Sequence, residues 1–404
     1  MTLAHGIGEV GGLPLPGELV LQTGGVVVLL SFLAVALLRK EPRHTGPVGG
    51  RAVTALTDGV VTALRAGVLV LAAVVVAVGF LGPQDPDANP APRALHVLLW
   101  VGLVPASLLL GPVWRVLDPL RLLHRLLAAA TGVPVTGAVP LPAWGYRPAV
   151  VGLAAYVWLE LVAPGRDRPA VVAGFLLAWA VVHVGAALRY GEGWFDRGEA
   201  FEVYSALAGA LSPLDVAEGR LRHPLRALGA VPVAPGLVAF VALWWGSTVF
   251  DGVSGLAGWA AVRSAAPVPA VLLDTAALAL LVVLVALLYR AATGALAAPL
   301  VTTLVPVAVG YTVAHYAVLL LVEGPRGVAQ LGGAVLGPVT AAPAPVLVAA
   351  VQVGAILVGH VVAVVAAHDR STALLPAHRR LADQVPLVLL MVVYTMVGLL
   401  LLTG

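Results

Sequence analysis

Five polar side chains of this chain lie inside, or at the ends of, long apolar stretches. Asp251 occurs in WWGSTVFDG, Asp274 in VLLDTAAL, Gln352 in AAVQVGAI, and both His315 and Glu323 occur in AHYAVLLLVEG. An ionisable group inside an apolar helix costs several kcal/mol unless it has a partner, so such residues mark functional sites by default. These five residues are therefore the first candidates for chemistry.

Four of these groups are expected at a similar depth in their helices. At about 1.5 Å per residue, Asp274 and Gln352 each lie about 10 Å into their segments, and His315 lies about 12 Å below Glu323. Asp251 lies at the outer end of its segment. Carboxylates with an imidazole suit a divalent metal such as zinc, manganese or iron. The same layer could instead relay protons or bind a cation in a transporter, and the sequence leaves these alternatives open.

Two histidines are expected deeper than this layer. His183 and His360 each lie about 14 or 15 residues from the outer ends of their segments. Two histidines at one depth on different helices can ligate haem b. Hydrogen bonds to backbone carbonyls or hydroxyls are an equally good interpretation. His368, in GHVVAVVAAHDR, is turned about 80° from His360 on a helix, so the two do not form one ligand pair. Because His368 lies where the helix meets Asp369 and Arg370, we expect it to face the cytoplasmic headgroups and His360 to face inward.

Familiar catalytic patterns are missing from the sequence. The chain contains no cysteine, which excludes disulfides, thiolate metal ligands and cysteine nucleophiles. HExxH and GxSxG do not occur. Ser247 and Thr248, beside Asp251, would be nucleophiles only with a base in reach.

The composition requires membrane helices to position these residues. Of the 404 residues 60% are hydrophobic and only 11% are charged, with a mean hydropathy of +1.00, whereas soluble domains carry about 25% charged residues. We expect an all-α, polytopic helical bundle that forms one domain over residues 1–404. About ten transmembrane helices are predicted, roughly at 20–38, 61–81, 94–113, 148–162, 169–188, 235–250, 268–289, 297–322, 345–367 and 385–402.

The distribution of basic residues predicts the orientation. Seventeen arginines and lysines lie in the loops after odd-numbered segments and five in the loops after even-numbered ones. Because basic loops stay in the cytoplasm, both termini are expected outside the plasma membrane, and the layer around His315 faces outward. The pI of 9.4 then reflects these loops, and no nucleic-acid partner is expected.

Two predicted cytoplasmic stretches are amphipathic. WRVLDPLRLLHRLLAAA begins at Trp114, and GEAFEVYSALAGALSPL begins at Gly198. They are expected to be short helices lying on the inner leaflet, and plain connectors are the simpler alternative.

Several motifs resemble those of one family. HGIG followed by LPLP, LLGPVWRVLDPLRLLHRLL, RYGEGWF, FEVYSALAGALSPL, GSTVFDG, GYTVAHYAVLLLVEG and GHVVAVVAAHDR span nearly the whole chain. Together they are similar to actinobacterial polytopic membrane proteins labelled fenitrothion hydrolase. The chain departs from that pattern at Gly12, where an acid is expected directly before LPLP.

The resemblance implies hydrolysis of an apolar phosphotriester that reaches the protein from the lipid. Such a reaction needs a metal-activated hydroxide. Asp251, Asp274, His315 and Gln352 would hold the metal, and Glu323 would be the base for the attacking water. His5 could fold over the cavity mouth.

Three functions therefore stay open. The metal-dependent hydrolase is narrowly preferred over a transporter for a cation or small solute. A haem-bearing electron-transfer subunit, with His183 and His360 as ligands, is third.

Overall fold

The computed structural model describes residues 17–334, 344–376 and 380–403, so His5 lies outside the described residues. Contacts group the chain into two compact units. The first unit holds Gly50–Arg222 and the segment that begins at Leu320, and the second holds the described residues before Gly50, His223–Leu319 and the residues from 344 onward. One domain over residues 1–404 stays a prediction.

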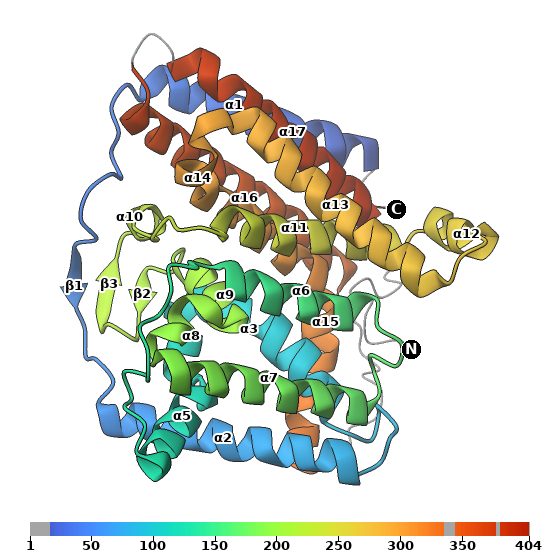
Figure 1. The fold of residues 1–404 in the computed structure, drawn as a ribbon. Coiled ribbons are helices and arrows are strands. Elements are labelled where there is room, and N and C mark those ends of the chain that lie inside the picture. Colours follow the sequence, from blue (N-terminus) through green and yellow to red (C-terminus); the bar gives the residue numbers. More distant parts are fainter. Residues whose placement is uncertain (1–16, 335–343, 377–379, 404) are drawn as a thin grey trace. The chain divides into compact units, whose positions relative to one another are not determined.

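Helices make up most of both units, and strands are few and short (Figure 1). The helices of the first unit are α2 (Asp58–Leu81), the π-helix η1 (Arg93–Val101), α3 (Gly102–Leu110), α4 (Val113–Leu117), α5 (Pro119–Thr131), α6 (Arg147–Leu161), α7 (Pro169–Tyr190), α8 (Gly193–Gly198), α9 (Ala200–Gly209) and the end of α15 (Val305–Leu331). A small antiparallel sheet, in the order β1 (Gly50–Ala52), β3 (Arg220–Arg222), β2 (Leu214–Asp215), joins its connecting segments.

In the described part of the second unit, the regular elements are all helices. It contains α1 (Gly17–Leu38), α10 (Pro224–Gly229), α11 (Leu237–Ser254), α12 (Ala257–Ala265), α13 (Ala270–Thr293), η2 (Gly294–Leu296), α14 (Ala297–Leu300), η3 (Val301–Leu304), the start of α15, α16 (Pro345–Leu374) and α17 (Arg380–Thr403). The predicted all-α class is thus confirmed for the described residues.

Local sequence signals explain where several helices begin and end. The carboxylate of Asp118 accepts a hydrogen bond from the Leu120 amide, and Pro119 occupies the first helical position of α5. Gly132 ends α5 in the left-handed conformation. A side-chain N-cap, a proline at the first position and a glycine at the C-terminal end are the usual helix punctuation.

Each of the ten predicted membrane segments lies on helical residues. Among the described residues, seven helical segments are long and apolar enough to cross a membrane. One of them, Ala270–Leu331, is 62 residues long and covers two of the predicted segments. The helix at 17–38 contributes only the shorter apolar run Gln22–Leu38, and α6 has 15 residues. The count of ten and the orientation of the termini stay predictions.

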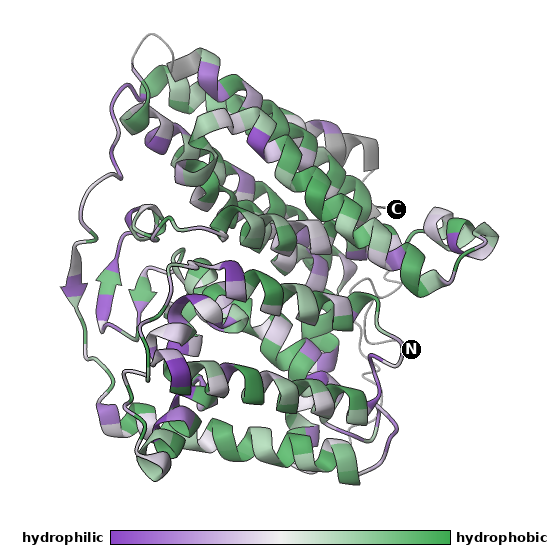
Figure 2. Ribbon diagram, in the orientation of Figure 1, coloured by the Kyte–Doolittle hydropathy of each residue, from purple (hydrophilic) through white to green (hydrophobic). Residues whose placement is uncertain are grey.

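The surfaces of the long helices are strongly apolar. On α13, Leu272, Leu280 and Leu287 are each about three-fifths exposed, at 59%, 66% and 59%. Figure 2 shows α13, α2 and α7 with mostly hydrophobic residues along their length. A water-soluble protein rarely leaves rows of large apolar side chains uncovered, whereas lipid solvates them well, so these faces suit contact with acyl chains.

One predicted surface helix is buried instead. All but one residue of α9 is buried, including Glu202 and Ser205. The expectation of an interfacial helix at this position is therefore wrong, because α9 packs on α3, α4, α6 and α8 within the first unit. Its two glutamates, which suggested a polar face, are directed at internal arginine and tryptophan side chains.

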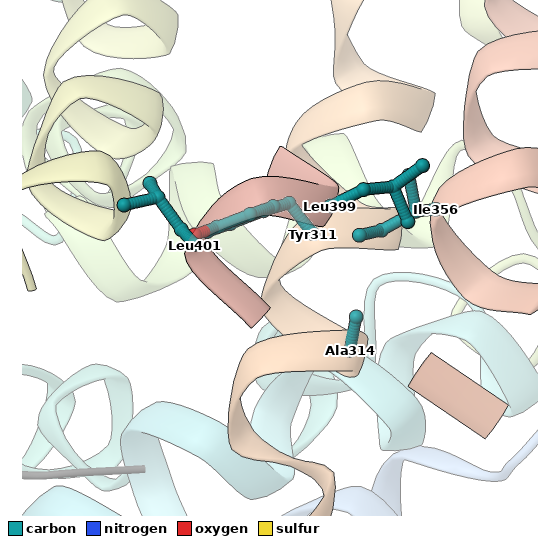
Figure 3. Close-up of a cluster of buried hydrophobic side chains, with 5 residues drawn as sticks. All are labelled: Tyr311, Ala314, Ile356, Leu399 and Leu401. Carbon is teal, nitrogen blue, oxygen red and sulfur yellow. The ribbon is translucent and has the colours of Figure 1, made fainter. Parts of the chain in front are cut away.

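Two helices of the second unit cross backbone against backbone. A Cβ at Gly310 of α15 would lie 2.5 Å from the carbonyl oxygen of Ala355, and a Cβ at Gly359 of α16 would lie 2.5 Å from that of Pro306. Only glycine therefore fits at this crossing. An apolar cluster adjoins it, formed by Tyr311, Ala314, Ile356, Leu399 and Leu401 (Figure 3).

Candidate functional site

The structure brings two of the predicted site residues into direct contact. Asp251, near the end of α11, accepts hydrogen bonds on Oδ2 from Nε2 of His315 and from the hydroxyl of Tyr316, each at 2.8 Å. All three side chains are buried, with residue exposures of 1–2% for Asp251, His315 and Tyr316. We call these three residues the Asp251 cluster.

Aromatic rings hold the imidazole of His315 in place. The ring of Tyr311, about one helical turn earlier on α15, stacks on His315 with 5.7 Å between centroids. The ring of Tyr316 meets the imidazole edge-on at 4.7 Å. Because Tyr311 also belongs to the apolar cluster with Ile356 and Leu399 (Figure 3), the packing of that cluster fixes the orientation of the histidine.

Three polar atoms around the Asp251 cluster have no hydrogen-bond partner among the described residues. These atoms are Oδ1 of Asp251, Nδ1 of His315 and the hydroxyl of Tyr311, and all three are buried. Buried polar groups nearly always have a partner, so each exception calls for an explanation. A carboxylate and an imidazole that each keep one free position can take up a proton or a ligand.

The hydroxyl groups near Asp251 are not poised as nucleophiles. Ser247 donates to the carbonyl of Trp244 at 2.8 Å, and Thr248 donates to that of Trp245 at 2.8 Å. Their protons are therefore committed to the backbone of α11. Neither has the side-chain base that nucleophilic catalysis needs.

Asp274 takes its partners from α12 instead of from the Asp251 cluster. Its Oδ1 accepts from the indole of Trp259 at 3.0 Å, and its Oδ2 lies 3.3 Å from the guanidinium of Arg263. These contacts attach α12 to the start of α13. Gln352, on α16, is half-buried.

Glu323 belongs to the first unit and is engaged by two arginines. Its Oε2 accepts from Arg93 and its Oε1 from Arg326, both at 2.7 Å. Arg93 also pairs with Asp87 at 2.7 Å. Both carboxylate oxygens are thus occupied by structural ion pairs, so the catalytic base predicted at Glu323 stays a prediction without a free oxygen to support it.

The expected metal ligands are only partly brought together. Within the described ranges, no group of three or more histidine, aspartate and glutamate side chains is placed to hold a metal ion. Asp251 and His315 form the one pair from the predicted set that is in contact. The set of Asp251, Asp274, His315 and Gln352 was predicted from equal depth, which does not specify which way each side chain points around its helix.

The two deeper histidines lie in different units, so a shared haem stays a prediction. Nδ1 of His183 accepts a hydrogen bond from the indole of Trp194 at 3.0 Å. Nδ1 of His360 donates to the carbonyl of Ile356 at 2.8 Å, while its Nε2 is buried without a partner among the described residues. The inward orientation expected of His360 is confirmed by its 2% exposure.

The orientation predicted for His368 is wrong. The residue is 5% exposed, and its two ring nitrogens contact Oε1 of Gln384 and the carbonyl of Arg39, each at 2.9 Å. The neighbouring Asp369 accepts from the backbone amides of Arg43 and His44 at 2.6 and 2.9 Å. Together they tie the segment after α1 to α16, which explains why polar residues end this apolar helix.

A second group of charges, built around the buried Arg121 and Glu202, was missed by the sequence interpretation. In the first unit, Arg121 on α5 lies 3.4 Å from Glu202, 2.9 Å from Asp196 and 3.8 Å from Asp118. Arg115 contacts Glu202 at 3.0 Å. The sequence did indicate an ion pair, because Asp118 and Arg121 are three residues apart and therefore share one helix face. The stretch that contains them was instead interpreted as a helix lying on the inner leaflet.

We call Arg115, Asp118, Arg121, Asp196 and Glu202 the ionic cluster. Burial raises the pKa of its Asp118 and of the neighbouring Glu199. The pKa of Asp118 is raised to about 7, first by burial and then by repulsion from Glu202, with Arg121 opposing. The pKa of Glu199 is raised to about 8, first by burial and then by the charge of Asp118. Glu199 caps α9 through the amides of Phe201 and Glu202 and accepts from the indole of Trp179 at 3.0 Å. Burial therefore favours the protonated form of both carboxyl groups.

Comparison of this chain with protein-family models, with characterised proteins and with solved structures gives no match.

Proposed function

We propose that the chain is a multi-pass protein of the plasma membrane and that the Asp251 cluster is the proton-exchange site of a carrier for a cation or small solute. The observation that carries the proposal is the contact of Asp251 with His315 on two apolar helices, each residue keeping one buried, unpartnered atom. Ionisable pairs of this kind in membrane helices are typical of proton relays in pumps and transporters.

The proposal assigns the proton exchange to named atoms. With Nε2–H of His315 donating to Asp251, Nδ1 is the free base that accepts a proton. The imidazolium that forms is stabilised by the adjacent carboxylate charge. Tyr316 donates to the same oxygen and keeps Asp251 oriented. The free Oδ1 of Asp251 is then the position at which a cation competes with the proton.

The membrane environment strengthens this coupling. In a low-dielectric site, one unit charge changes the binding of a second charge far more than it does in water. Proton uptake at His315 therefore weakens cation binding at Asp251, and the reverse holds by linkage. A carrier needs such mutual exclusion between its two substrates.

A second candidate, a metal-dependent phosphotriester hydrolase, is favoured by the orientation of His315. Metal-binding histidines usually give their other ring nitrogen to a carboxylate, and Asp251 has this relation to His315. Nδ1 of His315 would hold the ion, and a bound divalent metal supplies an activated hydroxide for triester hydrolysis. The similarity to proteins labelled fenitrothion hydrolase supports the same reading.

Proteoliposomes that contain a pH-sensitive dye test the carrier. We expect an imposed gradient of Na⁺, K⁺ or Mn²⁺ to change the internal pH with the wild-type chain. The change should be lost in Asp251→Asn and in His315→Gln. Thr395→Val is the matched control, because it removes another buried polar group of the second unit that bonds only to its own helix.

Asp274→Asn separates the two candidates. Its partners lie on α12, so the carrier proposal expects normal ion-driven pH changes in this variant. The hydrolase instead expects stoichiometric bound metal and triester turnover, both lost in Asp274→Asn and in His315→Gln. If ion gradients never move protons and metal-linked turnover is found, the hydrolase replaces the carrier.

A further inference from the structure

The first unit contains a cavity of about 210 Å³ that the candidate functions do not use. Residues of the loop before α6 and of α8 line it, including Trp144, Gly145, Pro148, Trp194, Arg197 and Gly198. It has the size for a small polar head group and contains one guanidinium among aromatic and proline side chains.

The loop that forms one wall is attached firmly to the end of α7. The amide of Val139 donates to the carbonyl of Arg189 at 2.9 Å, and the amide of Glu192 donates to that of Val135 at 3.3 Å. Gly137 and Gly191 have positive φ angles of 90° and 84°. A Cβ at Gly137 would lie 2.3 Å from the backbone nitrogen of Gly191, and a Cβ at Gly191 would lie 2.2 Å from the carbonyl oxygen of Thr136. The wall is therefore specified by the sequence and is not a loose surface loop.

Aromatic rings form the rest of the cavity. Trp194 is buried, and its indole nitrogen donates to His183 at 3.0 Å. Trp144 meets Trp194 edge-on at 6.5 Å and Tyr190 edge-on at 5.5 Å. A Cβ at Gly198 would lie 2.8 Å from the Trp194 ring, so a glycine is needed for this ring to lie flat on α8. His183 thus acquires a role as the residue that orients the cavity wall.

The guanidinium of Arg197, the cationic group that lines the cavity, is available for a ligand. Arg197 is exposed, and its guanidinium lies over the ring of Tyr146 at 5.8 Å. Among the described residues, no carboxylate forms an ion pair with Arg197. Its neighbour Asp196 is taken by Arg121. A guanidinium held by an aromatic face, with its N–H groups unspent, is well suited to a phosphate.

The predicted orientation of the chain in the membrane indicates which ligand this cavity would meet. Arg197, on α8, and Arg147, at the start of α6, belong to stretches between predicted membrane segments that the positive-inside rule assigns to the cytoplasm. Tryptophan and tyrosine gather at the level of lipid headgroups, and basic pockets on the cytoplasmic side of membrane helices bind anionic lipid headgroups. We propose that this cavity binds the phosphate-bearing headgroup of an anionic phospholipid of the inner leaflet, with Arg197 as its cationic contact.

Thermal unfolding of the purified full chain in detergent, with native mass spectrometry of bound lipid, tests this site. We expect phosphatidylglycerol to raise the melting temperature and to remain bound. In Arg197→Gln its apparent affinity should fall about fivefold, the effect of one basic residue at an anionic surface. Trp144→Ala should weaken retention of the lipid. Arg290→Gln, another exposed arginine from a predicted cytoplasmic loop, is the control and should bind as the wild type does.

Two comparisons decide the nature of the ligand. Phosphatidylcholine, which is zwitterionic, should stabilise less than phosphatidylglycerol at equal concentration. Free glycerol phosphate should compete only weakly, because it lacks the acyl chains that hold a lipid at the interface. Equal binding by Arg197→Gln and wild type, or equal stabilisation by the two lipids, would overturn the proposal. Strong saturable binding of glycerol phosphate alone would instead assign a soluble phosphate ester.

Discussion

The two units each bury a group of polar and charged side chains, but the groups are built differently. In the first unit, Glu202 has two arginine partners, Arg115 and Arg121, so its charge is compensated inside the protein. In the second unit, Asp251 has a histidine and a tyrosine and no arginine or lysine among its described contacts. The ionic cluster is suited to holding α5, α8 and α9 together, and the Asp251 cluster is suited to exchanging charge.

The difference lies in which partner can change its state. Arginine stays protonated at every accessible pH, so the ionic cluster keeps its two positive charges when the pH of the solution changes. Histidine is the side chain that proteins use most often for proton transfer, and the second unit places one against Asp251. Under the proposed function, the basic residue is therefore what separates the structural charge group from the charge-exchanging one.

Arg121→Leu should have the largest effect on stability. The change leaves Glu202 buried without one of its two arginine partners, and removing one partner of a buried ion pair typically costs about 3–5 kcal/mol. We expect a strong fall in melting temperature or a loss of folded protein. Arg125→Leu is the control, since Arg125 pairs with Glu192 at the surface, and such pairs contribute about 0–1 kcal/mol. Similar melting of the two variants would contradict a structural role for the ionic cluster.

Asp251→Asn should leave the fold largely intact and abolish exchange. Asparagine keeps a hydrogen-bonding group for Tyr316 but cannot stabilise an imidazolium at His315. We expect the ion-driven pH change in proteoliposomes to fall by at least about tenfold, as when a general acid–base group is lost. Retention of wild-type rates by this variant would remove the Asp251 cluster from the mechanism.

Raising the pH should destabilise the first unit through Glu199. Its pKa is raised from 4.5 in the unfolded chain to about 8 when folded. The folded state therefore holds a proton that the unfolded state has lost, and the stability from this group disappears as pH rises from about 4.5 to about 8. We expect the melting temperature to decline between pH 6 and pH 8 and the decline to be shallower in Glu199→Gln. An unchanged slope in this variant would assign the pH effect to other groups.

Tyr316→Phe should have a smaller effect on both properties. It removes one hydrogen bond to Asp251, which contributes about 1–3 kcal/mol when the acceptor is charged and buried. The exchange rate should fall by a few fold, because Asp251 loses its orienting contact but keeps His315. A complete loss of exchange would show that the tyrosine itself carries the proton.

Gln352→Leu should change least. The side chain is half-buried on α16, and substitutions away from networks and tight packing usually change stability by about 0.5 kcal/mol or less. We expect wild-type melting and wild-type exchange. A clear loss of exchange, together with loss of bound metal, would return Gln352 to the ligand set that its depth predicted.

Helix positions were predicted well because a membrane helix is specified by a continuous apolar run. The ten expected segments all lie on helices, and the short segment at 148–162 matches α6 (Arg147–Leu161). Depth placed Asp251 and His315 in one predicted layer, and these two side chains are in contact. Depth fixes one coordinate, however, and the rotation of each side chain around its helix comes from packing, which is why Asp274 has partners on α12.

Burial of amphipathic segments was the main failure. The stretches at α5 and α9 look like surface helices because they alternate charges with leucine or alanine, yet Arg121 and Glu202 are buried. Each charge is complemented by a residue far along the chain, such as Arg115 with Glu202. Local periodicity cannot reveal a partner 87 positions away.

We expect the backbone crossing of Gly310 and Gly359 to be the pivot between α15 and α16. With carbonyl oxygens 2.5 Å from where side chains would begin, the two backbones are in direct contact, so we expect any relative motion of α15 and α16 to be a tilt about this point. The end of α16 at Leu374 lies 15 residues beyond Gly359, or about 22 Å, so a tilt of about 5° moves it by about 2 Å. His315 lies close to this crossing, five residues after Gly310 on α15. Such a tilt therefore displaces it much less than it displaces the end of α16.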